Sequence, residues 1–88
     1  MIENYNNYED KLFRASAIPD EIEGCNFKNC TIVNDKNVTF NKCNIETTQI
    51  MSSSTFTYCN IYYNDDTELP EGCILYKSNL NKLNKIEE

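Results

Sequence analysis

An eight-residue pattern of polar and apolar positions recurs along the middle of the chain. The pattern is small, polar, large apolar, two polar, small, polar, large apolar, and its copies cover residues 25–32, 38–45, 54–61 and 73–80. Only Tyr58 and Ile74 depart from it. The first large residue of each copy stands at position 27, 40, 56 or 75, so the variation in spacing lies in the connecting segments. Such repeats are typical of solenoids, in which each coil packs on the next.

Each copy is expected to consist of two short extended segments joined by a corner. A small residue two positions before a large one places both side chains on one side of a strand. The two large residues of a copy are five positions apart, so one straight strand would turn Phe27 and Ile32 to opposite faces. We therefore expect the chain to turn within each copy. The expected corners are residues 28–29, 41–42, 57–58 and 76–77.

Stacked coils would bring equivalent residues of successive copies into ladders, at a spacing of about 4.8 Å. One expected ladder is Phe27, Phe40, Phe56 and Leu75, and a second is Ile32, Ile45, Ile61 and Leu80. A third ladder, of small residues, is Cys30, Cys43, Cys59 and Ser78. Small side chains are needed in the third ladder because a narrow coil has no room for two large residues side by side.

The pattern predicts an all-β fold, a short β-solenoid of about four irregular coils, within a single domain of residues 1–88. Residues 25–80 would form the coils, residues 1–24 an N-terminal cap, and residues 81–88 a C-terminal cap or tail. Caps are expected because the outermost coil at each end of a solenoid exposes unpaired backbone. A small β-sandwich or an α+β domain is the alternative.

Apolar residues recur at helical spacing near both ends of the chain. They are Ile2, Tyr5, Tyr8 and Leu12 at the N-terminal end, and Leu80, Leu83 and Ile86 at the C-terminal end. This spacing predicts a short helix at each end, although the asparagines among residues 4–7 weaken the first. Such helices would cap the coils or dock a partner. Residues 13–18 are alternatively a degenerate fifth copy of the repeat.

The short segments resemble the repeats of the pentapeptide-repeat proteins, which read small residue, Asn or Asp, large apolar, then two variable positions. The matching triplets are 25–27, 30–32, 38–40, 43–45, 54–56, 59–61 and 78–80. The resemblance covers residues 25–80 and implies a right-handed, four-sided β-helix. This chain departs from the family pattern because its pentapeptides come in pairs separated by unequal linkers.

The composition lacks the common catalytic and metal-binding groups. The chain has no histidine, and its five cysteines include no Cys-x-x-Cys pair, which disfavours zinc sites and catalytic triads. Its two glycines stand far apart, so no phosphate-binding loop is recognisable. We therefore expect no enzyme activity, no catalytic residue, no metal and no cofactor. The cysteines are interpreted as packing residues in a reducing compartment.

Acidic side chains outnumber basic ones by 14 to 8, which gives a formal charge of −6. This charge disfavours direct binding to the phosphate backbone of nucleic acids. No stretch approaches the roughly 18 apolar residues of a membrane span, and the N-terminal residues lack the basic start and apolar run of a signal peptide. We therefore expect a cytoplasmic protein, in the host cell cytoplasm if it is viral, with no membrane partner.

A coil filled by its own side chains leaves no space for a substrate, so we expect a binding protein that works through its surface or ends. The pentapeptide-repeat proteins that this chain resembles include acidic rods, which mimic duplex DNA and occupy the DNA site of a topoisomerase. By analogy, we expect a small inhibitor of viral or phage type that binds a nucleic-acid-handling host or defence enzyme. The candidate partner-binding residues are Tyr62, Tyr63, Asp65, Asp66, Glu68 and Glu71.

Exposed aromatic side chains beside charges are common in protein interfaces, which favours this segment as a binding site. Ordinary exposure of a loop explains the same residues equally well. The alternative function is a structural module of a fibre or shell, whose coil ends stack on copies of itself. Self-association would then take the form of a homodimer or larger assembly through the coil ends or caps.

Overall fold

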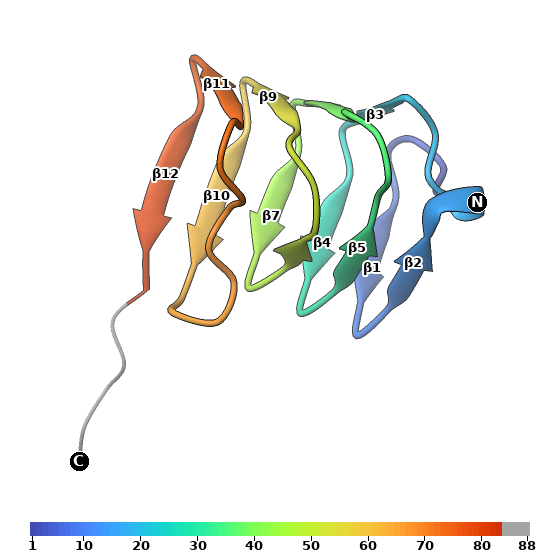
Figure 1. Ribbon diagram of the computed structural model, residues 1–88, viewed down its shortest axis with the longest axis horizontal. Helices are drawn as coiled ribbons and strands as arrows, with labels where there is room; N and C mark the ends of the chain where they lie inside the picture. Colours follow the sequence, from blue (N-terminus) through green and yellow to red (C-terminus); the bar gives the residue numbers. More distant parts are fainter. Residues whose placement is uncertain (84–88) are drawn as a thin grey trace.

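The computed structural model describes residues 1–83. Over this range the chain winds into a β-solenoid of about four turns, built from strands of two to four residues that stack side by side (Figure 1). The predicted all-β solenoid is therefore confirmed. One short 3₁₀ helix, Ala15–Ala17, interrupts the strands.

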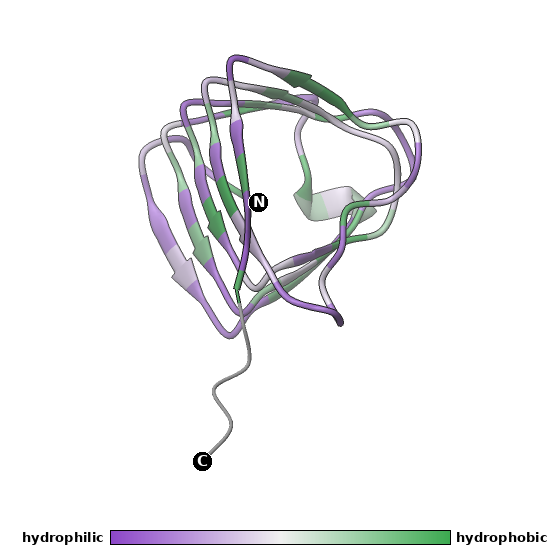
Figure 2. Ribbon diagram, turned by 90° about the vertical axis from the view of Figure 1, so that its left-hand side faces the viewer, coloured by the Kyte–Doolittle hydropathy of each residue, from purple (hydrophilic) through white to green (hydrophobic). Residues whose placement is uncertain are grey.

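Three parallel sheets form the sides of the coil. The first sheet contains β1 (Asn7–Glu9), β4 (Asn26–Lys28), β7 (Asn44–Glu46), β10 (Asn60–Tyr63) and β12 (Asn79–Lys82). The second contains β2 (Leu12–Arg14), β5 (Thr31–Val33) and β8 (Gln49–Ile50). The third contains β3 (Glu21–Glu23), β6 (Thr39–Asn41), β9 (Thr55–Thr57) and β11 (Ile74–Tyr76). Every strand pairs with the equivalent strand of a neighbouring coil, and the view along the solenoid shows the chain circling its core (Figure 2).

The second residue of each strand points inward and stacks on its equivalent one coil away. In the first sheet this ladder is Tyr8, Phe27, Ile45, Ile61 and Leu80. In the second sheet it is Phe13, Ile32 and Ile50, and in the third it is Ile22, Phe40, Phe56 and Leu75. The three ladders meet on the solenoid axis, where most of these residues are buried. This burial of apolar area is the main force that holds the coils together.

The predicted ladders are correct except for their first members. Phe27 stacks between Tyr8 and Ile45 rather than beside Phe40, and Ile32 stacks between Phe13 and Ile50 rather than beside Ile45. The reason is that copy 25–32 runs over the first and second sheets, whereas the three later copies run over the third and first sheets. The strand that completes this coil is β3, which has acidic residues at the positions flanking its apolar residue and so does not show the repeat.

All four expected corners contain a residue with positive φ, and these residues are Asn29, Lys42, Tyr58 and Lys77. A left-handed conformation costs about 1 kcal/mol or more for a residue with a side chain. Hydrogen bonds between coils offset that cost, because the Lys42 amide donates to the Thr57 carbonyl at 2.9 Å and the Tyr58 amide to Tyr76 at 3.0 Å. The corners therefore stack as regularly as the strands.

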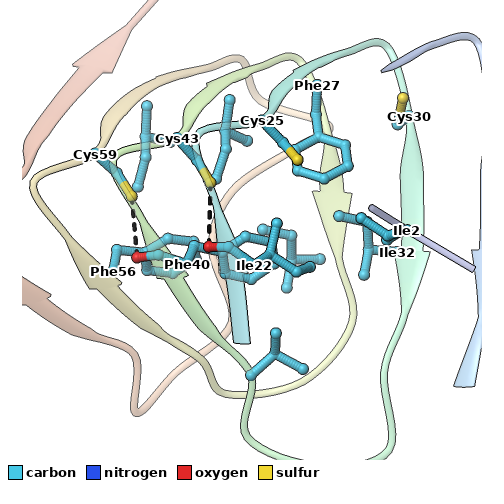
Figure 3. Packing of buried hydrophobic residues seen from close by; sticks show 14 of the residues in the cluster. Ile2, Ile22, Cys25, Phe27, Cys30, Ile32, Phe40, Cys43, Phe56 and Cys59 are labelled. Carbon is cyan, nitrogen blue, oxygen red and sulfur yellow. Dashed lines mark hydrogen bonds between the residues drawn. The ribbon is translucent and has the colours of Figure 1, made fainter. Parts of the chain in front are cut away.

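Small residues follow the corner between the third and first sheets. The Cys43 thiol donates to the Ile22 carbonyl at 3.5 Å, the Cys59 thiol to the Phe40 carbonyl at 3.2 Å, and the Ser78 hydroxyl to the Phe56 carbonyl at 3.0 Å. Figure 3 shows both thiols aimed at these carbonyls across the narrow coil. Cys25 begins this ladder. Cys30, which was expected there, lies at the next corner, where its amide donates to the Thr48 hydroxyl at 3.3 Å.

The prediction of an N-terminal helix is wrong, because residues 7–9 and 12–14 are strands of the first coil. Tyr8 and Phe13 are five positions apart across a corner at Asp10, which is the same step as Phe27 to Ile32. Residues 13–18 are not themselves a fifth copy of the repeat, because residues 13–14 end β2 and residues 15–17 form the 3₁₀ helix. At the other end, residues 81–82 continue β12 and no helix follows up to residue 83, while the last turn of the expected C-terminal helix, including Ile86, falls outside the described residues.

Candidate docking site at the open C-terminal end

The two ends of the solenoid differ in how their core ladders finish. At the N-terminal end, Ile2 is only 3% exposed, and its amide donates to the Ala17 carbonyl at 2.8 Å, which holds it over the first coil beside buried Ile18. Tyr8 stacks on Phe27 with ring centroids 5.6 Å apart. The apolar core is therefore closed at this end.

At the C-terminal end the ladders finish in the open. Leu75 is 41% exposed and Leu80 is 45% exposed, whereas their neighbours one coil earlier, Phe56 and Ile61, are 0% and 1% exposed. All four occupy the inward position of a strand. Figure 2 looks onto this end of the molecule. Within residues 1–83 nothing packs over Leu75 and Leu80.

Three further large residues of the last coil are exposed, Ile74, Tyr76 and Leu83. We define the C-terminal apolar patch as these three residues together with Leu75 and Leu80. Ile74 and Tyr76 flank Leu75 on β11 and therefore face outward, beside the end of the coil. Several large apolar side chains exposed on one coil mark an interaction site more often than a scattered exposed leucine does. The patch continues at its edge onto Tyr58, whose ring meets that of Tyr76 edge-on at 5.9 Å.

Unpaired backbone lies beside the patch. Strands β11 and β12 each pair with one neighbour, β9 and β10, so no strand among residues 1–83 occupies their other edges. The amides of Asn79 and Leu83 donate to the carbonyls of Cys59 and Tyr63, at 2.9 and 2.7 Å. Because backbone groups alternate in direction along a strand, those of Leu80 and Lys82 face the free edge. This edge is a ready template for a further strand.

The predicted partner-binding residues lie on β10 and on the loop that leads from β10 to β11. Tyr63 and Glu68 line a hollow of about 190 Å³ together with Leu69 and Leu80, so the structure brings these two to the patch. Asp65 forms an ion pair with Lys82 on β12 at 2.9 Å. The hydrogen bond and charge of Asp65 raise the pKa of the Lys82 ammonium, although both groups are exposed to solvent.

The other three predicted residues are not gathered at the hollow. Tyr62 faces outward from β10, in register with Glu46 and Asn81. Asp66 and Glu71 are exposed on the loop. The loop is held locally, because the Asn64 side chain accepts a hydrogen bond from the Asp66 amide at 2.9 Å.

Sequence reasoning missed the apolar half of this site. Leu75 and Leu80 carry the same pattern as the buried residues of earlier coils, and the repeat alone does not tell which coil has a neighbour on both sides. The one signal is that residues 81–88 do not repeat the eight-residue pattern. The acidic and aromatic half was identified because loops with such residues stand out from the repeat.

The thiols inside the solenoid are poor candidates for chemistry. Burial raises the pKa of the Cys25 thiol, and the hydrogen bond with Cys59, together with burial, raises that of Cys43. The same hydrogen bond lowers the pKa of the Cys59 thiol, but Cys59 is only 1% exposed and so is out of reach of a substrate. These thiols donate hydrogen bonds to main-chain carbonyls, which is a structural role. Among residues 1–83, no group of three His, Cys, Asp or Glu side chains is arranged to hold a metal ion.

A second, larger hollow of about 470 Å³ lies along the third sheet, and its lining residues include Glu21, Glu23, Lys42 and Tyr58. Its floor consists of exterior strand residues such as Thr39. Its residues already bond to one another, since the Asn41 amide donates to the Glu23 carboxylate at 3.1 Å. The C-terminal end, with its uncovered core residues, is therefore the stronger candidate.

None of the helical segments in the described part of the chain reaches the length and apolar character needed to cross a membrane. No family model, no curated protein and no solved structure matches this chain. The resemblance to pentapeptide-repeat proteins therefore rests on the triplets and on the stacking of coils that they predicted.

Proposed function

We propose that the protein is a non-catalytic interaction protein that binds another protein through its C-terminal apolar patch. The observation that carries this proposal is the sudden exposure of the core ladders, from 0% and 1% at Phe56 and Ile61 to 41% and 45% at Leu75 and Leu80. A partner that covered these leucines would bury core-type side chains next to a free strand edge, which is the composition of an interface centre.

The packing of the solenoid supports a binding role over catalysis. Phe27, Phe40 and Phe56 fill the axis and are almost completely buried, so the interior offers no chamber for a substrate. The acidic loop lies at the rim of the patch, where charged groups contribute to partner selection and association rate more than to affinity.

A narrower form of the proposal is an inhibitor that mimics nucleic acid and blocks a nucleic-acid-handling enzyme. The exposed acids of the loop support it, but the outer face of the first sheet does not. Glu9, Lys28 and Glu46 follow one another in register, and Lys28 lies 4.0 Å from Glu46. Alternating charge of this kind differs from the uniform negative charge of a phosphate backbone, so we base the proposed function on the apolar patch.

The test compares binding to a purified partner, found first by affinity capture, for the wild type and two variants. Leu75→Asp combined with Leu80→Asp is expected to weaken binding by at least about tenfold. The control is Leu12→Asp, a 55% exposed leucine on β2 at the closed end, which should bind as the wild type does. Apolar docking also predicts little change between low and high salt. Equal binding by all three proteins would refute the proposal.

A further inference from the structure

We infer that the C-terminal apolar patch is covered by a second copy of the chain, related by a two-fold axis that pairs β12 antiparallel with its counterpart. This inference rests on the proposed function, since it names the partner of the same surface. It is carried by the sequence symmetry of β12, by the closed N-terminal end and by the free strand edge.

The first argument is that β12 is symmetric about its central residue. Its sequence at 79–81 is Asn-Leu-Asn, with both asparagines outward and Leu80 inward. The other four strands of the first sheet also begin with asparagine, but their second outward residue differs. These second residues are Glu9, Lys28, Glu46 and Tyr62. Only β12 among the strands of this sheet presents identical outward residues to a copy of itself.

A two-fold axis at Leu80 places Asn79 opposite Asn81 of the second copy. The outward asparagines of the first sheet already form a column, in which the Asn79 side chain donates to Asn60 at 2.9 Å and Asn26 donates to Asn7 at 2.6 Å. The pairing would continue that column across the axis with amides that both donate and accept. Leu80 would meet Leu80 of the second copy, which extends the inward ladder as well.

The backbone fits the same register. The amide and carbonyl of Leu80 face the free edge of β12, so the two Leu80 residues would form a hydrogen-bonded antiparallel pair with two N–H to O=C bonds. Lys82 of each copy lies close to the axis, and each is neutralised by its own Asp65 at 2.9 Å. The pairing therefore brings no unpaired like charges together.

The N-terminal end is less open to a further copy than the C-terminal end. Strands β1 and β2 each pair with one neighbour and keep a free edge, but head-to-tail stacking of complete coils would also need the edge of β3, to which residues 4 and 5 already bond. The Glu23 amide donates to the Asn4 side chain at 3.0 Å, and the Tyr5 amide donates to the Glu23 carbonyl at 2.9 Å. A fibre is thus disfavoured, and a two-fold contact between open ends closes on itself.

The contact is small, so the dimer should depend on concentration. The two shorter dimensions of the molecule are 26 and 23 Å, and an end of that size offers on the order of 500 Å² per copy, compared with ~800 Å² in a standard stable interface. We therefore expect monomer and dimer to coexist in the micromolar range.

The test is sedimentation of the full chain over a concentration series. The average mass is expected to rise towards twice the chain mass of 10.3 kDa. Asn79→Lys with Asn81→Lys, and separately Asn79→Glu with Asn81→Glu, should each raise the dissociation constant at least about tenfold, because like charges then face one another across the axis. Mixing the two variants should restore the dimer, because opposite charges then meet.

The matched control is Asn7→Lys with Asn26→Lys, which adds the same charge to the same column far from the axis and should dimerise as the wild type does. Circular dichroism melting verifies that each variant is folded. A wild type that stays monomeric at every concentration, or variants that fail to restore each other, would overturn the inference.

The outcomes also separate this inference from the proposed function. A monomeric protein that still binds a foreign partner through Leu75 and Leu80 overturns the second copy and leaves the proposed function standing. A monomer that binds no partner through these leucines overturns both. A third outcome is that a chain ending at residue 83 dimerises and the full chain does not. Residues 84–88 would then be the occupant of the patch, and the inference would be overturned.

Discussion

Phe40 and Phe56 stack in parallel across neighbouring coils, with ring centroids 5.1 Å apart and an interplanar angle of 11°. Both rings are fully buried, and their strands, β6 and β9, are in register in the third sheet. Phe27 meets Phe40 edge-on at 6.1 Å from the first sheet. The rings thus join two sides of the solenoid and successive coils at one point, so the centre of the molecule depends on Phe40.

Replacing Phe40 with alanine is therefore expected to destabilise the fold strongly. Loss of a buried aromatic side chain costs about 3–5 kcal/mol, because a cavity remains where the ring was. This is a large fraction of the stability of so small a domain. Urea denaturation followed by circular dichroism measures the change. Leu12→Ala on the exposed outer face is the control, and a Phe40→Ala protein that unfolds at the wild-type midpoint would show that the ladder does not hold the coils together.

The sequence predicted the coil and its corners because both depend on local spacing. The step of five residues between large side chains requires a turn wherever it occurs, and Asn29, Lys42, Tyr58 and Lys77 all adopt the required left-handed conformation. Local spacing does not reveal which side of the coil a copy occupies. The pattern therefore places Phe27 on the wrong side of the coil. The strand that completes its coil is β3, which the pattern does not reveal because Ile22 lies between two glutamates.

The ends of the solenoid were harder to predict for a different reason. Whether an inward leucine is buried depends on a neighbouring coil, and that neighbour is not encoded near the residue itself. Leu80 and Ile61 occupy the same position of the same triplet, yet among residues 1–83 only Ile61 has a strand on both sides. Half of the candidate site therefore consists of residues that the pattern placed in the core.

Gly24 is expected to resist replacement by alanine at its corner between the third and first sheets. Its φ is +67°, and an added Cβ would collide with the ring of Tyr5. The left-handed conformation alone should cost about 1 kcal/mol, and the collision adds to it.

A double-mutant cycle separates the two costs of Gly24→Ala. Combining it with Tyr5→Ala removes the ring, so the remaining penalty should be that of the backbone alone. Thermal and urea unfolding of the four proteins give the coupling energy. Additive effects of the two substitutions would mean that the Tyr5 ring does not lie against Gly24 in solution.

Stability is expected to fall as the pH rises above about 9, in part because of Cys25. Burial raises the pKa of this thiol above its ordinary value of 9.0. The unfolded chain then releases the proton at a lower pH than the folded chain does, so the stabilisation is complete below the unfolded pKa and is lost as the pH rises towards the folded pKa. Urea unfolding at a series of pH values from 8 to 10.5 measures the slope.

The contribution of Cys25 is isolated by comparison with Cys25→Ser, whose hydroxyl does not ionise in this range. The decline of stability with pH should be shallower in the serine variant. Ser78 occupies the equivalent ladder position and donates to the Phe56 carbonyl at 3.0 Å, so serine fits the site. Parallel slopes for the two proteins would exclude the buried thiol as a source of the pH dependence.

Neutralising the acids of the loop should leave the fold unchanged. Asp65 and Asp66 are exposed, and surface ion pairs such as the one between Asp65 and Lys82 contribute little to stability in water. The double variant Asp65→Asn, Asp66→Asn should melt within about 4 °C of the wild type.

Because apolar docking relies on Leu75 and Leu80, we also expect this variant to bind its partner with nearly wild-type affinity, but more slowly. Stopped-flow association at low and high salt separates the rate from the affinity. A loss of affinity as large as that of the leucine variants would instead support the narrower proposal of nucleic-acid mimicry.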